Sequence, residues 1–247
     1  MSSSLYHTLN ISRQDILSRL SDLDVTSNNL ANVNTAGYKT SRSNFQELLT
    51  EQMKQGDKLT STQLMLGEGS LKTSENPLDW AIQGEGFFGV KLPDGKTGYT
   101  RDGQFVLDAN RKLVTAAGYP LIWDGEITAK MTDISVRADG VVTAVDETGK
   151  SVEVGTVQLN RFTNPTALTN NGNNVWLETT SSGKAQTGAA ASDNFGVITG
   201  GSVELSNVDL SQEMTHLLTL QRAFSMSIKA FQQTDTMIQQ AINLRKA

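Results

Sequence analysis

The two ends of the chain carry a helical hydrophobic pattern that the middle lacks. At the N-terminal end, apolar residues recur every seven positions, which places them on one side of a helix. The C-terminal end repeats this spacing and predicts a helix from about Leu210 to Arg245, with Ser206 or Ser211 as candidate N-caps. The recurring residues are Leu9, Ile16, Leu23 and Leu30 in the first helix, and Leu210, Leu217, Phe224, Phe231 and Ile238 in the second.

Two polar residues, Gln221 and Asp235, interrupt the apolar side of the C-terminal helix. They are either solvated edge positions or residues that fix the register between neighbouring helices, as polar residues in a helical seam can do. The pattern alone leaves both interpretations open.

The middle of the chain predicts β structure. Short apolar stretches alternate with turn signals, and Asp-Gly pairs at 94–95, 102–103, 124–125 and 139–140 predict turns between strands. Residues 179–194 are small and polar and predict a loop or extended linker. The expected fold class is α+β, with long terminal helices around a central domain of short antiparallel strands. The expected segments are an N-terminal helix with an Asn-rich turn (1–40), a connector (41–75), a β-rich domain (76–200) and a C-terminal helix (201–247).

A long helix with a single apolar side cannot bury that side alone, and isolated helices are marginal in water. Each buried Leu or Phe contributes roughly 1.5–3 kcal/mol, so about ten of them outweigh any single polar contact. The two helical ends must therefore pack on each other within one chain, or pack against other copies as the inner layer of a polymer.

Composition and charge exclude several function classes. The net charge of −5 lacks the basic face of a nucleic-acid binder, and the chain has no Cys for disulfides, thiolate catalysis or a Cys-based zinc site. No apolar run approaches the ~18 residues of a membrane span, and the N-terminus lacks the pattern of a Sec signal. We therefore expect a protein that is cytoplasmic or that leaves the cell without a cleaved signal.

Candidate chemistry is equally sparse. His7 and His216 are the only histidines, and each lies on a predicted helix without clustered carboxylates. The stretch "GEGFFG" (84–89) lacks the Lys-Ser/Thr of a phosphate loop, and the Asp-Gly pairs lack the spaced acidic ligands of a calcium loop. We expect no catalytic residue, no metal, no cofactor and no enzymatic activity.

The stretch "SNNLANVNTAGYK" (27–39) follows the first helix and contains four Asn residues. Asn tolerates left-handed backbone and bonds to neighbouring backbone groups, and Gly37 adopts positive φ without a steric penalty. The stretch thus predicts a helix stop and a chain reversal, although a simple cap needs only one such residue.

This stretch resembles the N-terminal signature of bacterial flagellar axial proteins, which comprise rod, hook and hook-associated proteins. The resemblance is carried by Asn28, Asn29, Leu30, Ala31, Asn32, Thr35, Gly37, Tyr38 and Lys39. The resemblance extends over nearly the whole chain, and within this family the chain is similar to the basal-body rod proteins in particular. The matching segments are "NPLDWAIQGEGFFGV" (76–90), "YTRDGQF" (99–105), "LVTAAGYPL" (113–121), "DGVV" (139–142), "VGTVQLNRFTN" (154–164) and "VELSNVDLSQEMTHLLTLQRAF" (203–224).

The resemblance implies that the terminal helices pair as a coiled coil in an inner layer, with the β-rich domain outside. It implies a helical polymer of many copies, which transmits motor torque to the hook and contacts other rod and hook proteins and the bushing rings around the rod. Neither nucleic acid nor membrane insertion is implied. The implied location is the flagellar basal body outside the cytoplasm, reached through the flagellar type III apparatus, and spanning the periplasm where an outer membrane exists.

Within the family, two classes of rod protein compete. The C-terminal helix resembles that of distal rod proteins, whereas the short stretch 50–75 is closer to proximal rod proteins. We expect the distal class first and the proximal class or the hook subunit second. A secreted fibre-forming β-domain protein with helical ends is the alternative outside the family.

Overall fold

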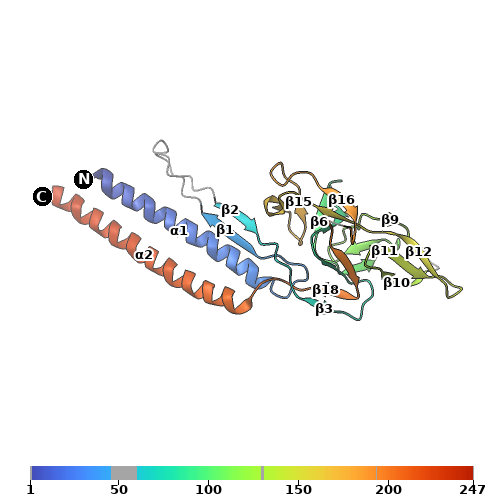
Figure 1. The fold of residues 1–247 in the computed structure, drawn as a ribbon. Helices are drawn as coiled ribbons and strands as arrows, with labels where there is room; N and C mark the ends of the chain where they lie inside the picture. Colours follow the sequence, from blue (N-terminus) through green and yellow to red (C-terminus); the bar gives the residue numbers. More distant parts are fainter. Residues whose placement is uncertain (1, 46–59, 129–130, 193, 247) are drawn as a thin grey trace. The chain divides into compact units, whose positions relative to one another are not determined.

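The computed structural model describes residues 2–45, 60–128, 131–192 and 194–246 (Figure 1). The chain forms two compact units. One comprises residues 1–31, 41–63 and 209–247, and the other comprises residues 32–40 and 64–208. The first is called the helical unit and the second the β-rich unit. Two long helices and a central region of antiparallel strands confirm the predicted α+β composition.

The helical unit contains α1 (Ser2–Ala31), α2 (Leu210–Lys246), β1 (Ser41–Phe45) and β2 (Thr60–Leu64). The two helices pack side by side, and both chain ends lie at the same end of the pair (Figure 1). A hydrogen bond from Ser227 Oγ to Asp15 Oδ2, 2.5 Å long, joins them. Strand β1 pairs with β2 and packs against α1.

The N-cap of α2 is Asp209, and the predicted Ser206 and Ser211 do not fill that position. The Oδ1 of Asp209 accepts hydrogen bonds from the backbone N–H groups of Ser211 (2.9 Å) and Gln212 (3.1 Å). A short carboxylate is well suited to this place, because it satisfies free N–H groups and carries the charge that a helix N-terminus attracts. The stretch 206–211 offers four residues of capping type, Ser206, Asn207, Asp209 and Ser211, and propensity alone does not choose among them.

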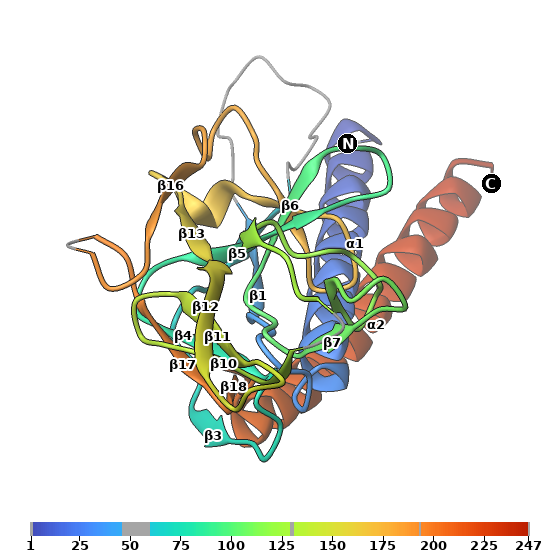
Figure 2. The same cartoon turned by 90° about the vertical axis from the view of Figure 1, so that its right-hand side faces the viewer.

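The β-rich unit is built from short antiparallel strands (Figure 2). A six-stranded sheet has the order β14-β15-β6-β5-β13-β16, and a four-stranded sheet has the order β10-β11-β12-β9. Pairs β17-β4, β18-β3 and β7-β8 complete it, with a 3₁₀ turn at Pro165–Ala167. The bounds are β3 (Leu71–Thr73), β4 (Trp80–Gln83), β5 (Phe87–Lys91), β6 (Thr97–Thr100), β7 (Phe105–Leu107), β8 (Leu113–Thr115), β9 (Asp124–Gly125), β10 (Thr132–Val136), β11 (Val141–Val145), β12 (Ser151–Thr156), β13 (Gln158–Arg161), β14 (Thr169–Asn170), β15 (Trp176–Leu177), β16 (Gln186–Ala189), β17 (Val197–Gly200) and β18 (Ser202–Glu204).

Aromatic side chains hold the core of this unit. Trp80 and Phe88 each meet Phe105 edge to face, with ring centroids 5.3 Å apart, and all three are fully buried. A second cluster surrounds Phe87, which contacts Phe162 and Trp176 in the same geometry. Edge-to-face pairs add roughly 0.5–1.5 kcal/mol beyond the burial of their area. The two Phe residues of the "GEGFFG" stretch therefore belong to the core.

Two loop predictions need correction. Asp124–Gly125 forms strand β9, which pairs with β12, because Gly155, which has no Cβ, lets the backbone of β12 approach that of β9 closely. The pair at 102–103 lies between two strands as predicted, although these strands, β6 and β7, do not pair with each other. Residues 179–194 contain strand β16. Only the pairs at 94–95 and 139–140 connect strands that pair directly, β5 with β6 and β10 with β11.

The predicted segment boundaries at residues 40, 75 and 200 stay a prediction. The expected connector, 41–75, contains β1, β2 and β3. Neither helix, over the residues described, has a stretch that is long and apolar enough to cross a lipid bilayer.

Candidate functional site

The signature stretch 27–39 divides between the two units, and its first half belongs to the helical unit. Asn29 is the buried residue there, with 2% of its surface exposed. Its Oδ1 accepts the N–H of Ser41 at 3.0 Å, and its Nδ2 donates to the Ser41 carbonyl at 2.9 Å. Nδ2 also lies 3.5 Å from Glu213 Oε1 on α2. The amide therefore joins α1, β1 and α2, which a residue that only stops a helix would not do.

The neighbours of Asn29 have local roles. Asn28 is exposed and donates to the Asp24 carbonyl one turn earlier at 3.0 Å. Leu30 is half-buried, and Ala31 is the exposed last residue of α1. Of the first five signature residues, Asn29 alone makes side-chain contacts that link separate elements, among the contacts described.

The second half of the signature forms a turn in the β-rich unit. The Asn32 carbonyl accepts the N–H of Thr35, and its Oδ1 accepts the Thr35 hydroxyl, each at 3.1 Å. Gly37 then takes φ +64°, and its N–H donates to the Glu204 carbonyl at 2.7 Å. Tyr38 is half-buried and its carbonyl accepts the N–H of Asn207. The predicted reversal occurs, and it is bound to the segment that precedes α2.

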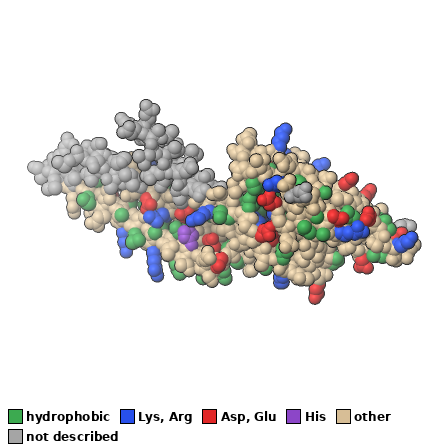
Figure 3. Space-filling model, viewed as in Figure 1, with side chains coloured by type: hydrophobic (Ala, Val, Ile, Leu, Met, Phe, Trp, Pro, Cys, Tyr) green, Lys and Arg blue, Asp and Glu red, His purple; other side chains and the backbone are tan. Residues whose placement is uncertain are grey.

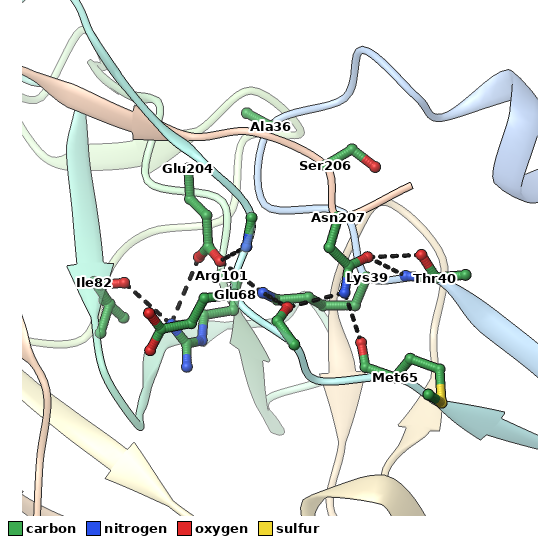
Figure 4. A network of polar contacts seen from close by, with 12 residues as sticks. Ala36, Lys39, Thr40, Met65, Glu68, Ile82, Arg101, Glu204, Ser206 and Asn207 are labelled. Atoms are coloured by element: carbon green, nitrogen blue, oxygen red, sulfur yellow. Dashed lines mark hydrogen bonds and ion pairs between the residues drawn. The ribbon is translucent and has the colours of Figure 1, made fainter. Parts of the chain in front are cut away.

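Lys39 ends the signature in a buried ion cluster (Figure 4). Its Nζ lies 2.6 Å from Glu204 Oε1 and donates to the Gly67 carbonyl at 2.8 Å. Arg101 reaches Glu204 Oε2 at 3.5 Å from the other side. The Lys39 and Glu204 side chains are 1% exposed and the Arg101 side chain is 5% exposed. Three segments that are distant in sequence therefore meet at one carboxylate.

Further contacts hold each charge in place. Arg101 donates to the carbonyls of Ile82 (3.2 Å) and Gly84 (2.7 Å), and its guanidinium lies 5.3 Å from the centre of the Phe87 ring. The Gly69 N–H donates to Glu204 Oε1 at 3.0 Å. Burial lowers the pKa of both Lys39 and Arg101, while attraction to Glu204 opposes that effect. The cluster is thus a packed, hydrogen-bonded feature of the fold.

Asn207 lies in the same region, and both polar atoms of its side chain form hydrogen bonds. Its Oδ1 accepts from the N–H and the hydroxyl of Thr40, each at 2.7 Å. Its Nδ2 donates to the carbonyls of Met65 and Gly67, each at 2.9 Å (Figure 4). Asn174 adds a further amide bond, 2.8 Å long, to the Ala36 carbonyl. Amide side chains thus bind the signature turn to segments on both sides of it.

The predicted helical seam lies mostly at half-buried positions. Leu220, which the seven-residue pattern omitted, is 7% exposed and lies three residues after Leu217. Leu9 is in α1, but its side chain lies outside the described part. The other residues of the predicted seam are half-buried, except Leu210, which is 47% exposed. The half-buried residues are Ile16, Leu23 and Leu30 on α1, and Leu217, Phe224, Phe231 and Ile238 on α2. The role of these residues in assembly stays a prediction.

Sequence reasoning missed Glu204, Arg101 and Asn207. All three stand in stretches that carried the family resemblance, but none was given a role there. Glu204 offered a signal, because it stands between Val203 and Leu205 in a short apolar stretch where a charge must be paired if it is buried. Its partners are 165 and 103 residues away, and spacing along the sequence does not reveal them.

The described residues offer no metal site, because they contain no suitable group of three His, Asp or Glu side chains. His216 is exposed on α2, and the side chain of His7 lies outside the described part. The charged and amide side chains of the site bind one another and nearby backbone groups, so the arrangement holds segments together.

Asp102, beside the cluster, makes stability depend on pH. Burial raises the pKa of the Asp102 carboxyl above its ordinary value of 3.8, so the folded state holds this proton to higher pH than the unfolded chain does. Stability from this group is present in acid and is lost as pH rises through the folded pKa. We therefore expect Asp102→Asn, which can still accept from the Gln104 N–H, to raise the melting temperature at pH 7.

That gain should shrink as the pH falls toward 3.8. Asp94 is the matched control, because hydrogen bonds from Lys96 lower the pKa of that exposed carboxyl. Asp94→Asn should not stabilise the protein at pH 7. Melting curves of both variants between pH 4 and pH 7 make the comparison, and a loss of stability in Asp102→Asn at pH 7 would show that the buried charge is favourable.

Comparison with known proteins places the chain in a family. Three family models match it, described as "Flagella basal body rod protein" (residues 19–39), "Flagellar hook protein FlgE/F/G D1 domain" (81–144) and "Flagellar basal body rod FlgEFG protein C-terminal" (199–244). The first match contains Asn29 and Lys39, the second contains Arg101, and the third contains Glu204. Each member of the ion cluster thus lies in a different matched segment.

Curated relatives match over nearly the whole length. The flagellar basal-body rod protein FlgG of Borreliella burgdorferi is 33% identical, over 91% of this chain and 93% of its own length. FlgG of Caulobacter vibrioides is 35% identical, over 91% and 94%. The flagellar hook-basal body complex protein FlhP of Bacillus subtilis is 31% identical, over 87% and 91%. The chain therefore belongs to the family of flagellar basal-body rod proteins, which is structural rather than enzymatic, and it corresponds to the distal rod members.

Proposed function

We propose that the helical unit polymerises with other copies into a helical drive shaft that transmits motor torque to the hook. In this proposal α1 and α2 pair as a coiled coil in the inner layer, and the β-rich unit forms the outer layer. The observation that carries the proposal is a second set of apolar side chains on the helices, which the α1–α2 packing leaves exposed.

This set is called the exposed apolar band. On α2, Leu210, Met214 and Leu218 follow one another at four-residue spacing and are 47%, 50% and 54% exposed. Met226 and Met237 are 66% and 54% exposed and lie about three helical turns apart, which places them on the same side as each other, roughly a quarter turn from Leu218. On α1, Leu17 and Leu20 are 47% and 46% exposed. Figure 3 shows hydrophobic side chains on the visible surface of the described part of the helices.

A band of this kind supports assembly. Apolar side chains scattered singly are ordinary on a protein surface, but an aligned set marks a protein contact. Leu218, Met226 and Met237 lie on a different side of α2 from the half-buried Leu217 and Phe224, whereas Leu210 stands in the same seven-residue row as those two. A copy with two distinct contact faces forms heterologous contacts, and these extend into a helical filament when they do not close into a ring.

The proposed partners and location follow from the same assignment. Many copies of the chain contact one another, and the ends of the polymer contact other rod and hook proteins. The bushing rings face the outer layer. The proposed location is the basal body outside the cytoplasm, in the periplasm where there is an outer membrane, reached by type III export without a cleaved signal. The basal-body names of the relatives support this placement.

Leu218→Asp tests the exposed apolar band. A carboxylate on a surface that must become buried opposes assembly, because a buried charge without a partner costs several kcal/mol. In the free monomer the side chain is 54% exposed, so folding should change by less than about 0.5 kcal/mol. We expect the variant to fold normally but to form no polymer in sedimentation, and cells carrying it as their only copy not to swim.

Two further variants complete this test. Leu218→Met keeps the position apolar and should assemble. Phe224→Asp places the charge at a half-buried position and should disturb both the helix pair and assembly. Normal polymer formation by Leu218→Asp would remove the exposed band from the proposed interface.

A further inference from the structure

We propose that a hollow on the β-rich unit binds a neutral saccharide. The hollow has a volume of about 420 Å³, which is within the usual range for small-molecule sites. Strands β5, β6, β13 and β16 of the six-stranded sheet contribute its floor, and the segment that enters β9 forms a wall with Trp123. The proposal is independent of polymerisation, because it concerns only side chains of the β-rich unit.

Gly89 keeps the floor open. A Cβ at this position would lie 3.0 Å from Asn160 Nδ2 and 3.8 Å from Ile122 Cβ. Any side chain would therefore occupy space between the amide and the wall. Gly89 does not have positive φ, so its backbone conformation alone does not require glycine. The missing side chain instead leaves room in front of the Asn160 amide.

Trp123 supplies a fixed aromatic wall. Its ring lies so close to Gly125 that a Cβ there would be 2.3 Å from ring atom Cζ3. The Trp123 side chain is half-buried and also packs against the main hydrophobic core. A held aromatic ring has a negatively polarised face that attracts the polarised C–H groups of a sugar ring. A rigid ring also loses little conformational entropy when a ligand binds.

The polar groups of the hollow can both donate and accept. Asn160 is 9% exposed, and its Oδ1 accepts the Thr187 hydroxyl at 2.9 Å. Its Nδ2 lies 3.4 Å from the Phe87 carbonyl. These contacts fix the amide while leaving it a second N–H, and the Thr187 oxygen still has acceptor capacity. Exposed Gln158 adds another amide. Hydroxyl groups, which donate and accept, match this set.

Charge narrows the ligand class. Among the described residues that line the hollow there is no Lys or Arg, and Asp124 is the one carboxylate. A phosphate, sulfate or uronic acid would find no cation there and would meet this negative charge. An apolar ligand would leave the buried Asn160 amide without a new partner. An uncharged ligand with many hydroxyl groups and an apolar ring face fits, and a saccharide has both.

Fluorescence titration of the full-length chain tests the proposal. Trp80 and Trp176 are 0% and 2% exposed, so a ligand-induced change in emission reports mainly on Trp123. The probe is chitotriose, a neutral trimer of N-acetylglucosamine, and trigalacturonate is the anionic comparison. We expect a saturable change with chitotriose and a Kd on the order of 1 mM, and no saturation with trigalacturonate.

Variants locate the binding. Gly89→Ala fills the floor and Thr187→Val removes a surface hydroxyl, and each should weaken binding at least about tenfold, because tenfold corresponds to a single good contact. Val152→Ala, 40% exposed on β12 and outside the hollow, should bind like the original chain. Thr187→Val keeps the test valid if Gly89→Ala fails to fold. Three results would overturn the proposal. The first is a fluorescence response that does not saturate up to about 20 mM chitotriose. The others are equal binding of trigalacturonate and an unchanged affinity for chitotriose in Thr187→Val.

Discussion

Glu204→Gln is expected to lower the free energy of unfolding of the β-rich unit by about 3–5 kcal/mol. The substitution keeps the size of the side chain but leaves Lys39 and Arg101 buried without their shared carboxylate. For a domain of this size the loss corresponds to a fall in melting temperature of roughly 10 °C. Tryptophan fluorescence measures it directly, because Trp80, Trp123 and Trp176 all lie in this unit.

The size of this effect reflects the removal of one partner and not the net value of the cluster. Three buried charges are costly to desolvate, and a well-packed apolar set can be equally stable. The double variant Lys39→Met, Glu204→Gln should therefore recover part of the loss, because one unpaired cation is then gone. This pattern separates a paired-charge cluster from a residue that merely fills space.

Glu85→Gln is the control for charge removal. Glu85 pairs with Arg161 at 2.6 Å, but its side chain is 70% exposed. Surface ion pairs contribute about 0–1 kcal/mol, so this variant should melt close to the original chain. Equal melting of Glu204→Gln and Glu85→Gln would contradict the account of the buried cluster.

Gly37→Ala is the second substitution with a large expected effect. At φ +64° a Cβ is strained, and here it would lie 2.5 Å from the Arg101 carbonyl carbon and 2.6 Å from the Asp102 nitrogen. Both contacts are with backbone, which cannot move aside as a flexible side chain can. Strain of about 1–2 kcal/mol and a clash of about 1–3 kcal/mol predict a loss of roughly 2–5 kcal/mol. Chemical denaturation followed by tryptophan fluorescence measures the loss.

Gly118→Ala separates the strain from the clash. Gly118 has φ +83°, but nothing lies within 4 Å of a Cβ built there. The variant should lose only the strain, about 1–2 kcal/mol. If both alanine variants lost the same amount, the close approach to Arg101 would have no energetic consequence, and the signature glycine would be explained by its backbone conformation alone.

The helices, the strand-rich middle and the turn at Gly37 could be predicted because their signals are local. Seven-residue spacing, turn dipeptides and a positive-φ glycine each act within a few residues. The same local reasoning failed at Asp124–Gly125, where a turn signal is a strand because β12 approaches it through Gly155. The conformation of Asp124–Gly125 depends on its pairing with β12, which is distant in sequence, so a short window of sequence does not reveal it.

The sequence predicted only those residues of the candidate site that belong to the signature stretch. Lys39 and Asn29 belong to the signature, but their partners Glu204, Ser41 and Glu213 lie elsewhere in the chain. Burial decided which signature residues matter most. Asn28 and Asn29 are adjacent and chemically identical, yet one is exposed and the other is 2% exposed. Composition explained why amides suit a turn, but not which segments each amide joins.

The exposed apolar band was also hidden in the sequence pattern. Leu217 and Leu218 are neighbours, and periodicity selected the first because it continues a seven-residue repeat. Leu218 belongs to a second row, four residues from Met214, which becomes visible only when the exposed side of α2 is known. The second apolar side of α2 is the one that we propose contacts another copy, and the sequence alone could not separate it from the side that faces α1.

Electron microscopy of basal bodies from a strain that lacks this chain is the most direct test of the central claim. A subunit of the distal rod predicts a short rod stub with no hook, and restored rod length when the gene is returned. A complete rod and hook in the deletion strain would contradict the proposed function and would favour a secreted fibre.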